Sequence, residues 1–288
     1  MTAATLLGGF RAHVAKIGGL RTRYWVGGEG PPLVLVHGLG GGALNFVALA
    51  PLLARRHRVL ALDLPGHGGS EPLSALDGLG DVAAHVAAVA EREEMLPAAV
   101  VGYSMGGVVA LRLAVARPEA VSALALVAAG GIVSQTRRAH IWLTVLAALR
   151  PARTVALARG TIARRPILRL PVFAYWGAED PRALSPAAVV GFLAPQREHT
   201  DVRGAARALL RDDPRPDLDR VGCPTVLVWG ARDRLIPLED GFEYARRLRC
   251  PIRVVPAAGH LVVGEFPAET AAALEDFLGR VDAARTAA

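Results

Sequence analysis

The sequence has little of three features that mark particular classes of protein. Its 288 residues include only two cysteines, too few for the disulfide framework of a small secreted domain. No apolar run approaches the roughly 20 residues that a membrane-spanning helix needs. The N-terminal stretch MTAATLLGGFRAHVAK lacks basic residues before its short apolar run, so we expect no signal peptide. These absences predict a cytoplasmic protein without stable insertion into a membrane.

Motifs for bound cofactors are also missing. Gly40, Gly41 and Gly42 lie in a glycine-rich loop, but this loop fits neither G-x-x-x-x-G-K-S/T nor a G-x-G-x-x-G that opens a helix. No group of cysteines, histidines and acidic residues has the spacing of a metal site. We therefore expect no cofactor, no metal ion and no nucleotide site.

Lysine is almost absent, and the positive charge is concentrated in one part of the chain. Lys16 is the single lysine among 33 basic residues. Residues 131–215 contain fourteen arginines and six acidic residues, whereas the rest of the chain is nearly neutral. A general Arg-rich composition accounts for this charge, and we favour that account over nucleic-acid binding. The alternative is a basic lid that attracts anionic substrates or makes peripheral contact with an anionic membrane.

Short apolar runs alternate with helical patterns along most of the chain. Most of the runs are continuously apolar, which is typical of strands buried on both faces. They comprise residues 20–26, 33–37, 59–62, 98–102, 123–127, 225–229 and 252–255. The helical patterns comprise residues 81–95, 108–116, 238–248 and 267–281. This alternation predicts an α/β fold with a mostly parallel sheet that is flanked by helices on both faces.

The alternation stops at residue 131 and resumes near residue 216. The segment between has few strand-like runs, many arginines and several prolines. Within it, residues 138–149 and 151–163 are predicted to form amphipathic helices. We expect an α/β core of residues 1–130 and 216–288, with a helical cap of residues 131–215 inserted after one strand. The helix at 138–149 is expected to pack over a substrate pocket, and contact with a membrane surface is the alternative.

The stretch VVGYSMGG, residues 100–107, places a lone serine among glycines. Ser104 follows an apolar run predicted to be a strand and precedes a helical pattern. Gly102 and Gly106 remove side chains where a turn between the two would be tightest. A serine on such a strand–turn–helix is the arrangement of a nucleophile elbow, and the first N–H groups of the helix point at the reacting centre. We therefore predict that Ser104 is a nucleophile.

A serine hydroxyl needs a general base and a group that orients this base. Asp233 lies in the loop after the predicted strand 225–229, and His260 follows the last predicted strand. The chain order Ser104, Asp233, His260 is the order that a catalytic triad follows in this kind of sheet. Asp180 competes with Asp233, because WGAED resembles WGARD, but it lies in the predicted cap with no strand and histidine after it. We predict His260 as the base and Asp233 as its orienting acid.

Together these motifs resemble the α/β-hydrolase superfamily, and in particular its capped serine hydrolases. The loop VHGLGG from Val36 is similar to the family's oxyanion loop, and DLPGHGGS from Asp63 is similar to its D-x-P-G-x-G-x-S loop. The resemblance covers residues 20–278. It implies a mostly parallel, eight-stranded sheet with a helical cap after the sixth strand. It also implies that the backbone N–H groups of Leu39 and Met105 form the oxyanion hole.

The resemblance predicts a serine hydrolase, specifically a carboxylesterase. It would cleave esters of small to medium apolar acyl groups through an acyl-enzyme intermediate, and its partner would be a small-molecule ester. Two alternatives stay open. One is a carbon–carbon bond hydrolase of ring-cleavage diketone acids, whose anionic substrates suit a basic cap. The other is a non-catalytic ligand-binding protein on the same fold.

The remaining histidines and the two cysteines are assigned more modest roles. His37 and His67 lie in the motif loops, where the family uses them structurally or near the pocket, and His199 is expected to be a surface or packing residue. Cys223 and Cys250 each open a predicted strand, and the family fold makes these strands neighbours. We favour two free buried thiols, with a disulfide as the alternative.

Overall fold

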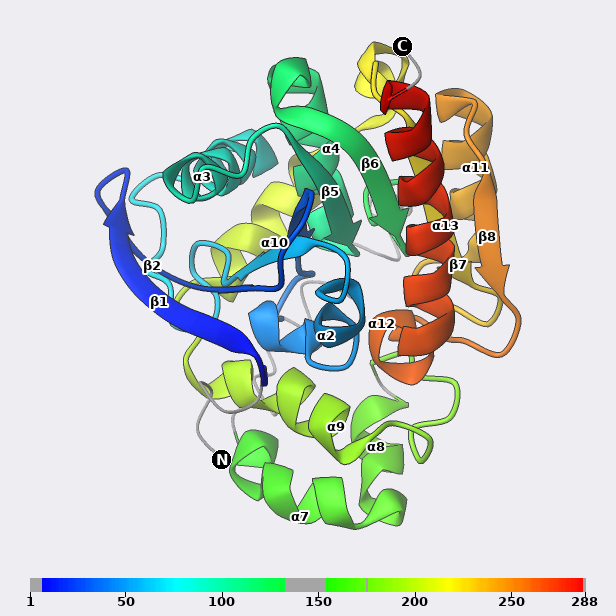
Figure 1. The fold of residues 1–288 in the computed structure, drawn as a ribbon. Coiled ribbons are helices and arrows are strands. Elements are labelled where there is room, and N and C mark those ends of the chain that lie inside the picture. The colour runs from blue at the N-terminus through cyan, green and yellow to red at the C-terminus, as the bar shows by residue number, and fades with distance from the viewer. Residues whose placement is uncertain (1–6, 133–153, 175, 287–288) are drawn as a thin grey trace.

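The computed structural model describes residues 7–132, 154–174 and 176–286, which are built around an eight-stranded sheet (Figure 1). The strand order is β1-β2-β4-β3-β5-β6-β7-β8. Neighbours from β4 to β8 are parallel, whereas β2 is antiparallel to both β1 and β4. The strands are β1 (Phe10–Ile17), β2 (Leu20–Gly27), β3 (Pro32–Val36), β4 (Arg58–Leu62), β5 (Ala98–Tyr103), β6 (Val121–Val127), β7 (Thr225–Gly230) and β8 (Ile252–Val255). The predicted mostly parallel α/β sheet is confirmed.

Successive residues of the inner strands pack into two separate hydrophobic layers. In β3, Leu33 and Leu35 belong to one layer, whereas Val34 and Val36 belong to the other. Side chains alternate between the two faces of a strand, so a strand covered on both faces has to be apolar at every position. β5 and β7 are accordingly buried at every residue. This packing is the physical reason for the continuous apolar runs of the sequence.

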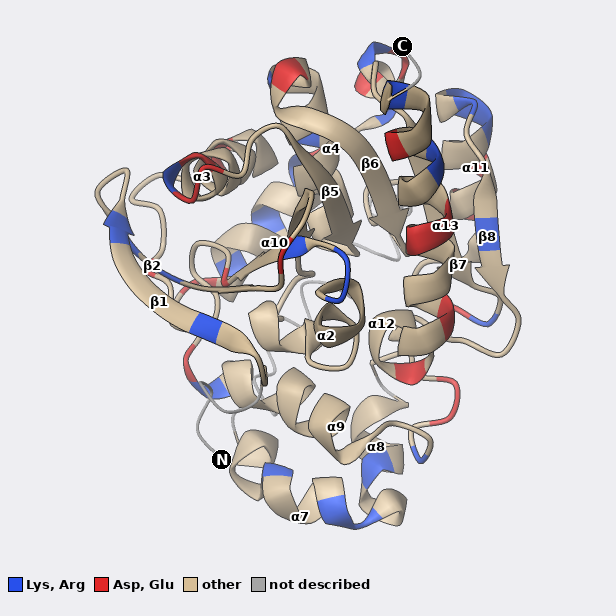
Figure 2. Ribbon diagram, in the orientation of Figure 1, with Lys and Arg blue, Asp and Glu red and all other residues tan. Residues whose placement is uncertain are grey.

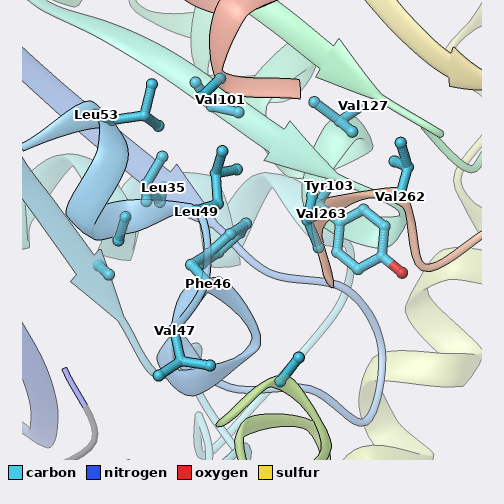
Figure 3. Close-up of a cluster of buried hydrophobic side chains, with 14 of the residues drawn as sticks. Leu35, Phe46, Val47, Leu49, Leu53, Val101, Tyr103, Val127, Val262 and Val263 are labelled. Carbon is cyan, nitrogen blue, oxygen red and sulfur yellow. The ribbon is translucent and has the colours of Figure 1, made fainter. Parts of the chain in front are cut away.

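Helices cover both faces of the sheet (Figure 1). The layer that contains Leu35 also contains residues of α2, α12 and α13, and Figure 3 shows part of it, including Phe46, Val101 and Val263. The layer that contains Val34 includes residues of α3, α4 and α11. These helices are α2 (Ala50–Leu53), α3 (Leu79–Arg92), α4 (Met105–Ala116), α11 (Leu238–Leu248), α12 (Val262–Glu265) and α13 (Pro267–Thr286). The four predicted helices correspond to α3, α4, α11 and α13.

The edge strand β1 has no counterpart among the predicted runs. Its sequence, FRAHVAKI, mixes polar and apolar residues, and only its terminal residues, Phe10 and Ile17, are buried. An edge strand pairs on one side only, and here most of its side chains face solvent. Polar residues are therefore tolerated along it, which is why hydrophobicity alone did not mark it as a strand.

Between β6 and β7 the chain leaves the sheet and forms helices α7 (Arg159–Arg164), α8 (Leu170–Phe173), α9 (Pro186–Leu193) and α10 (Val202–Arg211). The first three lie together at one end of the molecule (Figure 1). Helix α10 packs against α3 instead, and its Ala205, Ala208 and Leu209 join the layer of α3 and α4. The helix predicted at 138–149 and the start of the one at 151–163 lie outside the described residues. The division into a core and a cap of residues 131–215 stays a prediction.

Cys223 and Cys250 are free thiols, as the sequence favoured, but both are only partly buried and not fully buried as predicted. Strands β7 and β8 pair so that Leu227 lies opposite Ile252. The same register brings Cys250 level with Thr225, two residues along the chain from Cys223. The two cysteines are therefore offset along the strands and do not face each other.

Candidate active site

Ser104 lies on a sharp turn between β5 and α4. Its backbone has φ 56° and ψ −121°, a conformation that residues with a side chain rarely adopt. Three hydrogen bonds hold it there: its N–H donates to Val127 O (3.0 Å), and its carbonyl accepts from the N–H groups of Gly107 and Gly130 (both 2.9 Å). A strained residue that is fixed in this way is typical of a functional site.

Glycines let this turn approach its neighbours closely. A Cβ on Gly106 would lie 2.1 Å from the carbonyl oxygen of Val36, and a Cβ on Gly102 would lie 2.4 Å from that of Gly106. A Cβ on Gly38, in the loop after β3, would lie 2.8 Å from Ser104 Cβ. Larger residues at these positions would displace Ser104 or the loop that faces it.

Asp233 and His260 reach Ser104 from the ends of neighbouring strands. Asp233 follows β7 and His260 follows β8, and parallel strands end at the same edge of a sheet. His260 Nε2 lies 3.0 Å from Ser104 Oγ, and His260 Nδ1 lies 2.8 Å from Asp233 Oδ2. Both side chains are buried. The structure thus joins the three predicted residues in one chain of hydrogen bonds.

Asp233 is held so that one oxygen is reserved for His260. Its Oδ1 accepts hydrogen bonds from the backbone N–H groups of Leu235 (2.9 Å) and Ile236 (2.8 Å), both in the loop after β7. Oδ2 therefore points at His260 Nδ1. A carboxylate at this nitrogen selects the tautomer that keeps Nε2 free to accept the Ser104 hydroxyl proton.

The loop after β3 lies against Ser104 and is tightly organised. The N–H of Gly41 donates to the carbonyl of Gly38 (3.0 Å), and Gly40 takes φ 66°, so residues 38–41 form a tight turn that contains Leu39. Met105 is the first residue of α4, and its N–H has no carbonyl acceptor within that helix. The assignment of the Leu39 and Met105 N–H groups to an oxyanion hole stays a prediction.

His37 holds this loop through hydrogen bonds to the backbone. Its Nε2 accepts the N–H of Leu64 (2.9 Å), so the ring proton is on Nδ1, which donates to the carbonyl of Gly38 (2.8 Å). Burial holds the pKa of His37 well below its usual value, which keeps the ring neutral. His37 thus has a structural role next to the site.

The D-x-P-G-x-G-x-S loop is held by its first residue. Asp63 is fully buried and accepts hydrogen bonds from the N–H groups of Ala43 and Gly69 (both 2.9 Å) and from Arg23 Nε (2.7 Å). Burial raises the pKa of Asp63, while Arg23 and the two N–H groups act in the opposite direction. Asp63 therefore connects this loop to the segment after the oxyanion loop.

Two side chains from the inserted segment hold the oxyanion loop, and the sequence did not reveal them. Gln196 Nε2 donates to the carbonyl of Gly40. His199 Nδ1 accepts the N–H of Gly68 (2.9 Å), so its Nε2 donates to the same carbonyl of Gly40 (2.9 Å). These contacts join positions about 130 to 160 residues apart along the chain, and no local pattern in the sequence marks them.

The segment around Asp180 resembles the sequence around Asp233, and it contacts the loop that carries His260. Its Gly177 carbonyl accepts the backbone N–H of His260 (2.7 Å). Glu265 joins the two segments, because its carboxylate accepts the N–H groups of Glu179 (2.7 Å) and Gly259 (3.2 Å). The Asp180 carboxylate instead pairs with Arg182 at the surface (3.0 Å). Asp180 is therefore not the partner of His260, whereas its backbone neighbours position the histidine loop.

The geometry suits nucleophilic chemistry at a carbonyl carbon. A hydroxyl, an imidazole and a carboxylate are in hydrogen-bond contact, an arrangement that can activate the hydroxyl as a nucleophile. Among residues 7–132, 154–174 and 176–286, no group of three or more His, Cys, Asp and Glu side chains is placed to hold a metal ion.

A model of the alpha/beta hydrolase family matches residues 33–273. The matched span includes Ser104, Asp233 and His260, and all strands from β3 onwards. The chain belongs to the alpha/beta hydrolase family. Membership establishes the fold.

Relatives with named activities differ in their chemistry. One relative is the dihydrolipoyllysine-residue acetyltransferase component of the acetoin cleaving system of Pseudomonas putida. It is 33% identical over 258 residues, which is 86% of this chain and 64% of the relative. This chain therefore spans less than two thirds of the length of that relative. A pimeloyl-(acyl-carrier protein) methyl ester esterase of Chromobacterium violaceum is 33% identical over 77% of this chain and 83% of the esterase. A 2-hydroxymuconate semialdehyde hydrolase of a Pseudomonas species is 29% identical over 92% of this chain and 93% of the hydrolase.

A solved structure shares the architecture along nearly its whole length. An alpha/beta hydrolase fold protein from Burkholderia ambifaria superposes with a TM-score of 0.69 and is 30% identical. The match covers 92% of this chain and 97% of that one.

Proposed function

We propose that this alpha/beta hydrolase is a serine esterase that cleaves carboxylic esters of small to medium apolar acyl groups through an acyl-enzyme. The observation that carries the proposal is the chain of hydrogen bonds from Ser104 Oγ through His260 to Asp233, at 3.0 and 2.8 Å. The strained backbone of Ser104 supports it, because the turn presents the hydroxyl at the end of the sheet. The relative that is named a methyl ester esterase acts on the same class of bond.

In the first half-reaction Ser104 Oγ attacks the ester carbonyl carbon. His260 Nε2 takes the hydroxyl proton as the C–O bond forms, and Asp233 stabilises the resulting imidazolium. The N–H groups of Leu39 and Met105 donate to the oxyanion. The tetrahedral intermediate then expels the alkoxide, which receives the proton from His260, and the acyl group stays on Ser104.

In the second half-reaction water replaces the alcohol. His260 Nε2 removes a proton from the water as its oxygen attacks the acyl carbon. The same N–H groups hold the second oxyanion. Ser104 Oγ leaves and takes the proton back from His260, so the products are a carboxylic acid and the free enzyme.

A carbon–carbon bond hydrolase is the second candidate, and one observation favours it. The segment between β6 and β7 is rich in arginine, which suits an anionic diketone acid. A relative named 2-hydroxymuconate semialdehyde hydrolase matches over almost the full length of both chains. The same triad would serve, with a carbon leaving group in place of an alcohol.

Hydrolysis of p-nitrophenyl esters of increasing acyl length tests the proposal. We expect turnover by the wild type, with an optimum at short or medium chains, and a loss of about a thousandfold in kcat for Ser104→Ala. Thr200 is exposed, so the control variant Thr200→Ala should hydrolyse the esters at the wild-type rate. Equal rates for the wild type and Ser104→Ala on every ester would overturn the esterase proposal. Turnover of a diketone acid, with no ester cleaved, would establish the second candidate.

A further inference from the structure

The end of the molecule formed by α7 exposes large apolar side chains. Among the described residues, the two most exposed large hydrophobic side chains are Leu157 and Ile167, at 63% and 65%. Leu168 beside Ile167 is also exposed. Leu157 precedes α7 by two residues and Ile167 follows it closely, so both lie at the same end of the fold (Figure 1). Large aliphatic groups exposed along one short stretch of chain indicate a surface that contacts another apolar phase.

The same end carries positive charge alone. Residues 154–174 contain four arginines and no acidic residue, and in Figure 2 helix α7 shows blue segments without red. Arg164 and Arg165 are exposed, as is each residue from 164 to 168. Neither arginine forms an ion pair with another described residue. Their charges are therefore available to an external anion.

A buried arginine holds the exposed turn from beneath. Arg169 is only 5% exposed, and its guanidinium donates to the carbonyls of Arg182 (2.8 Å), Ala163 and Leu184. These bonds join the end of α7 to the loop before α9. The turn of residues 164–168 is thus supported on a fixed base, and its outer side chains form a preformed surface.

We propose that Leu157, Arg164, Arg165 and Ile167 form a docking surface for an anionic lipid bilayer. Aliphatic side chains insert at the boundary between headgroups and acyl chains, while the guanidinium groups bind lipid phosphates. No helix among the described residues is long and apolar enough to cross a bilayer. The proposed contact is a peripheral one.

Other occupants fit this surface less well. A nucleic acid would use the charges but would leave the aliphatic side chains in water. A second copy of the chain would place arginine against arginine, which opposes association. An anionic bilayer satisfies both features, and its binding does not depend on Ser104 or on the proposed esterase activity.

Vesicle co-sedimentation of the full chain tests the docking surface. The probes are vesicles of phosphatidylcholine alone and vesicles with about one third phosphatidylglycerol. We expect binding to the anionic vesicles that salt weakens. Arg164→Gln/Arg165→Gln should weaken it about 25-fold, since each basic residue near such a surface contributes about fivefold. Leu157→Ser/Ile167→Ser should weaken it roughly tenfold or more at every salt concentration.

Matched controls make the test specific. Arg55 and Arg56 are another adjacent exposed pair, and Phe242 on α11 is 52% exposed, so Arg55→Gln/Arg56→Gln and Phe242→Ser should bind like the wild type. Ser104→Ala should also bind normally, which separates docking from catalysis. Three results would overturn the proposal: equal binding to both kinds of vesicle, equal losses in the controls, or a dimer in light scattering that Ile167→Ser dissociates.

Discussion

At the scale of single residues, Glu265 shows how a group outside the triad can set the position of the base. Its carboxylate accepts three backbone N–H groups, from Glu179 and Asp180 on one side and from Gly259 on the other. Gly259 is the residue before His260, so the carboxylate fixes the loop that carries the imidazole. Burial raises the pKa of Glu265, and the three N–H groups oppose this change. We therefore expect Glu265 to act as a positioning residue for His260.

Glu265→Gln should reduce kcat about tenfold with little change in KM. The amide can accept on one oxygen only, and its NH2 group would face an N–H donor, which misaligns the His260 loop. The expected loss of stability is about 1–3 kcal/mol, measured by urea unfolding. Glu269→Gln, an exposed change in the first turn of α13, is the control. If the two variants have the same kcat, Glu265 does not position the base.

At the scale of elements, the inserted segment completes the loop that faces the serine. Gln196 and His199 follow α9 and donate to the carbonyl of Gly40. His199 also holds Gly68, in the loop after β4. The oxyanion loop is thus fixed by a segment that leaves the sheet after β6 and returns to it at β7. We therefore expect the insertion to influence the reaction through this loop.

His199→Ala should lower kcat about tenfold to a hundredfold while KM stays within about threefold. Oxyanion donors act in the transition state, so a loosened donor loop reduces kcat more than substrate binding. Labelling of Ser104 by a fluorophosphonate should slow in parallel, because the tetrahedral phosphorus centre uses the same donors. Thr200→Ala, exposed and adjacent, should behave like the wild type. A rise in KM with an unchanged kcat would assign His199 to substrate binding instead.

At the scale of the whole molecule, buried histidines connect stability to pH. His37, His67 and His199 form a row of ring contacts, with centroids 5.2 and 5.4 Å apart. Burial lowers the pKa of His67 from 6.5 to about 4. In the unfolded chain His67 therefore binds a proton near pH 6.5, whereas in the folded protein it binds one only near pH 4. Stability falls as the pH falls through this window and levels off below it.

The wild type should lose about 3 kcal/mol of stability through His67 between pH 6.5 and pH 4. His67→Gln removes the titrating group, so its free energy of unfolding should depend less on pH over the same interval. Urea unfolding at several pH values measures the difference between the two slopes. Identical slopes for the wild type and His67→Gln would contradict the argument.

The sequence by itself determined the α/β alternation, the turn at Ser104 and the chain order of Ser104, Asp233 and His260. These features depend on local physics. Buried strands have to be apolar throughout, a sharp turn needs glycines, and a loop at the end of a strand carries its polar residue to the edge of the sheet. The edge strand β1 was not predicted, because a half-exposed strand does not have to be apolar at every position.

Only the tertiary structure decided which distant groups support these residues. Glu265 and Gly177 fix the loop of His260, and Gln196 and His199 hold the carbonyl of Gly40. Each contact joins segments brought together by the closure of the whole fold, and a glutamate or histidine in one segment carries no local sign of its partner in another. Local sequence marks the predicted catalytic residues, whereas the packing of the whole fold sets their alignment.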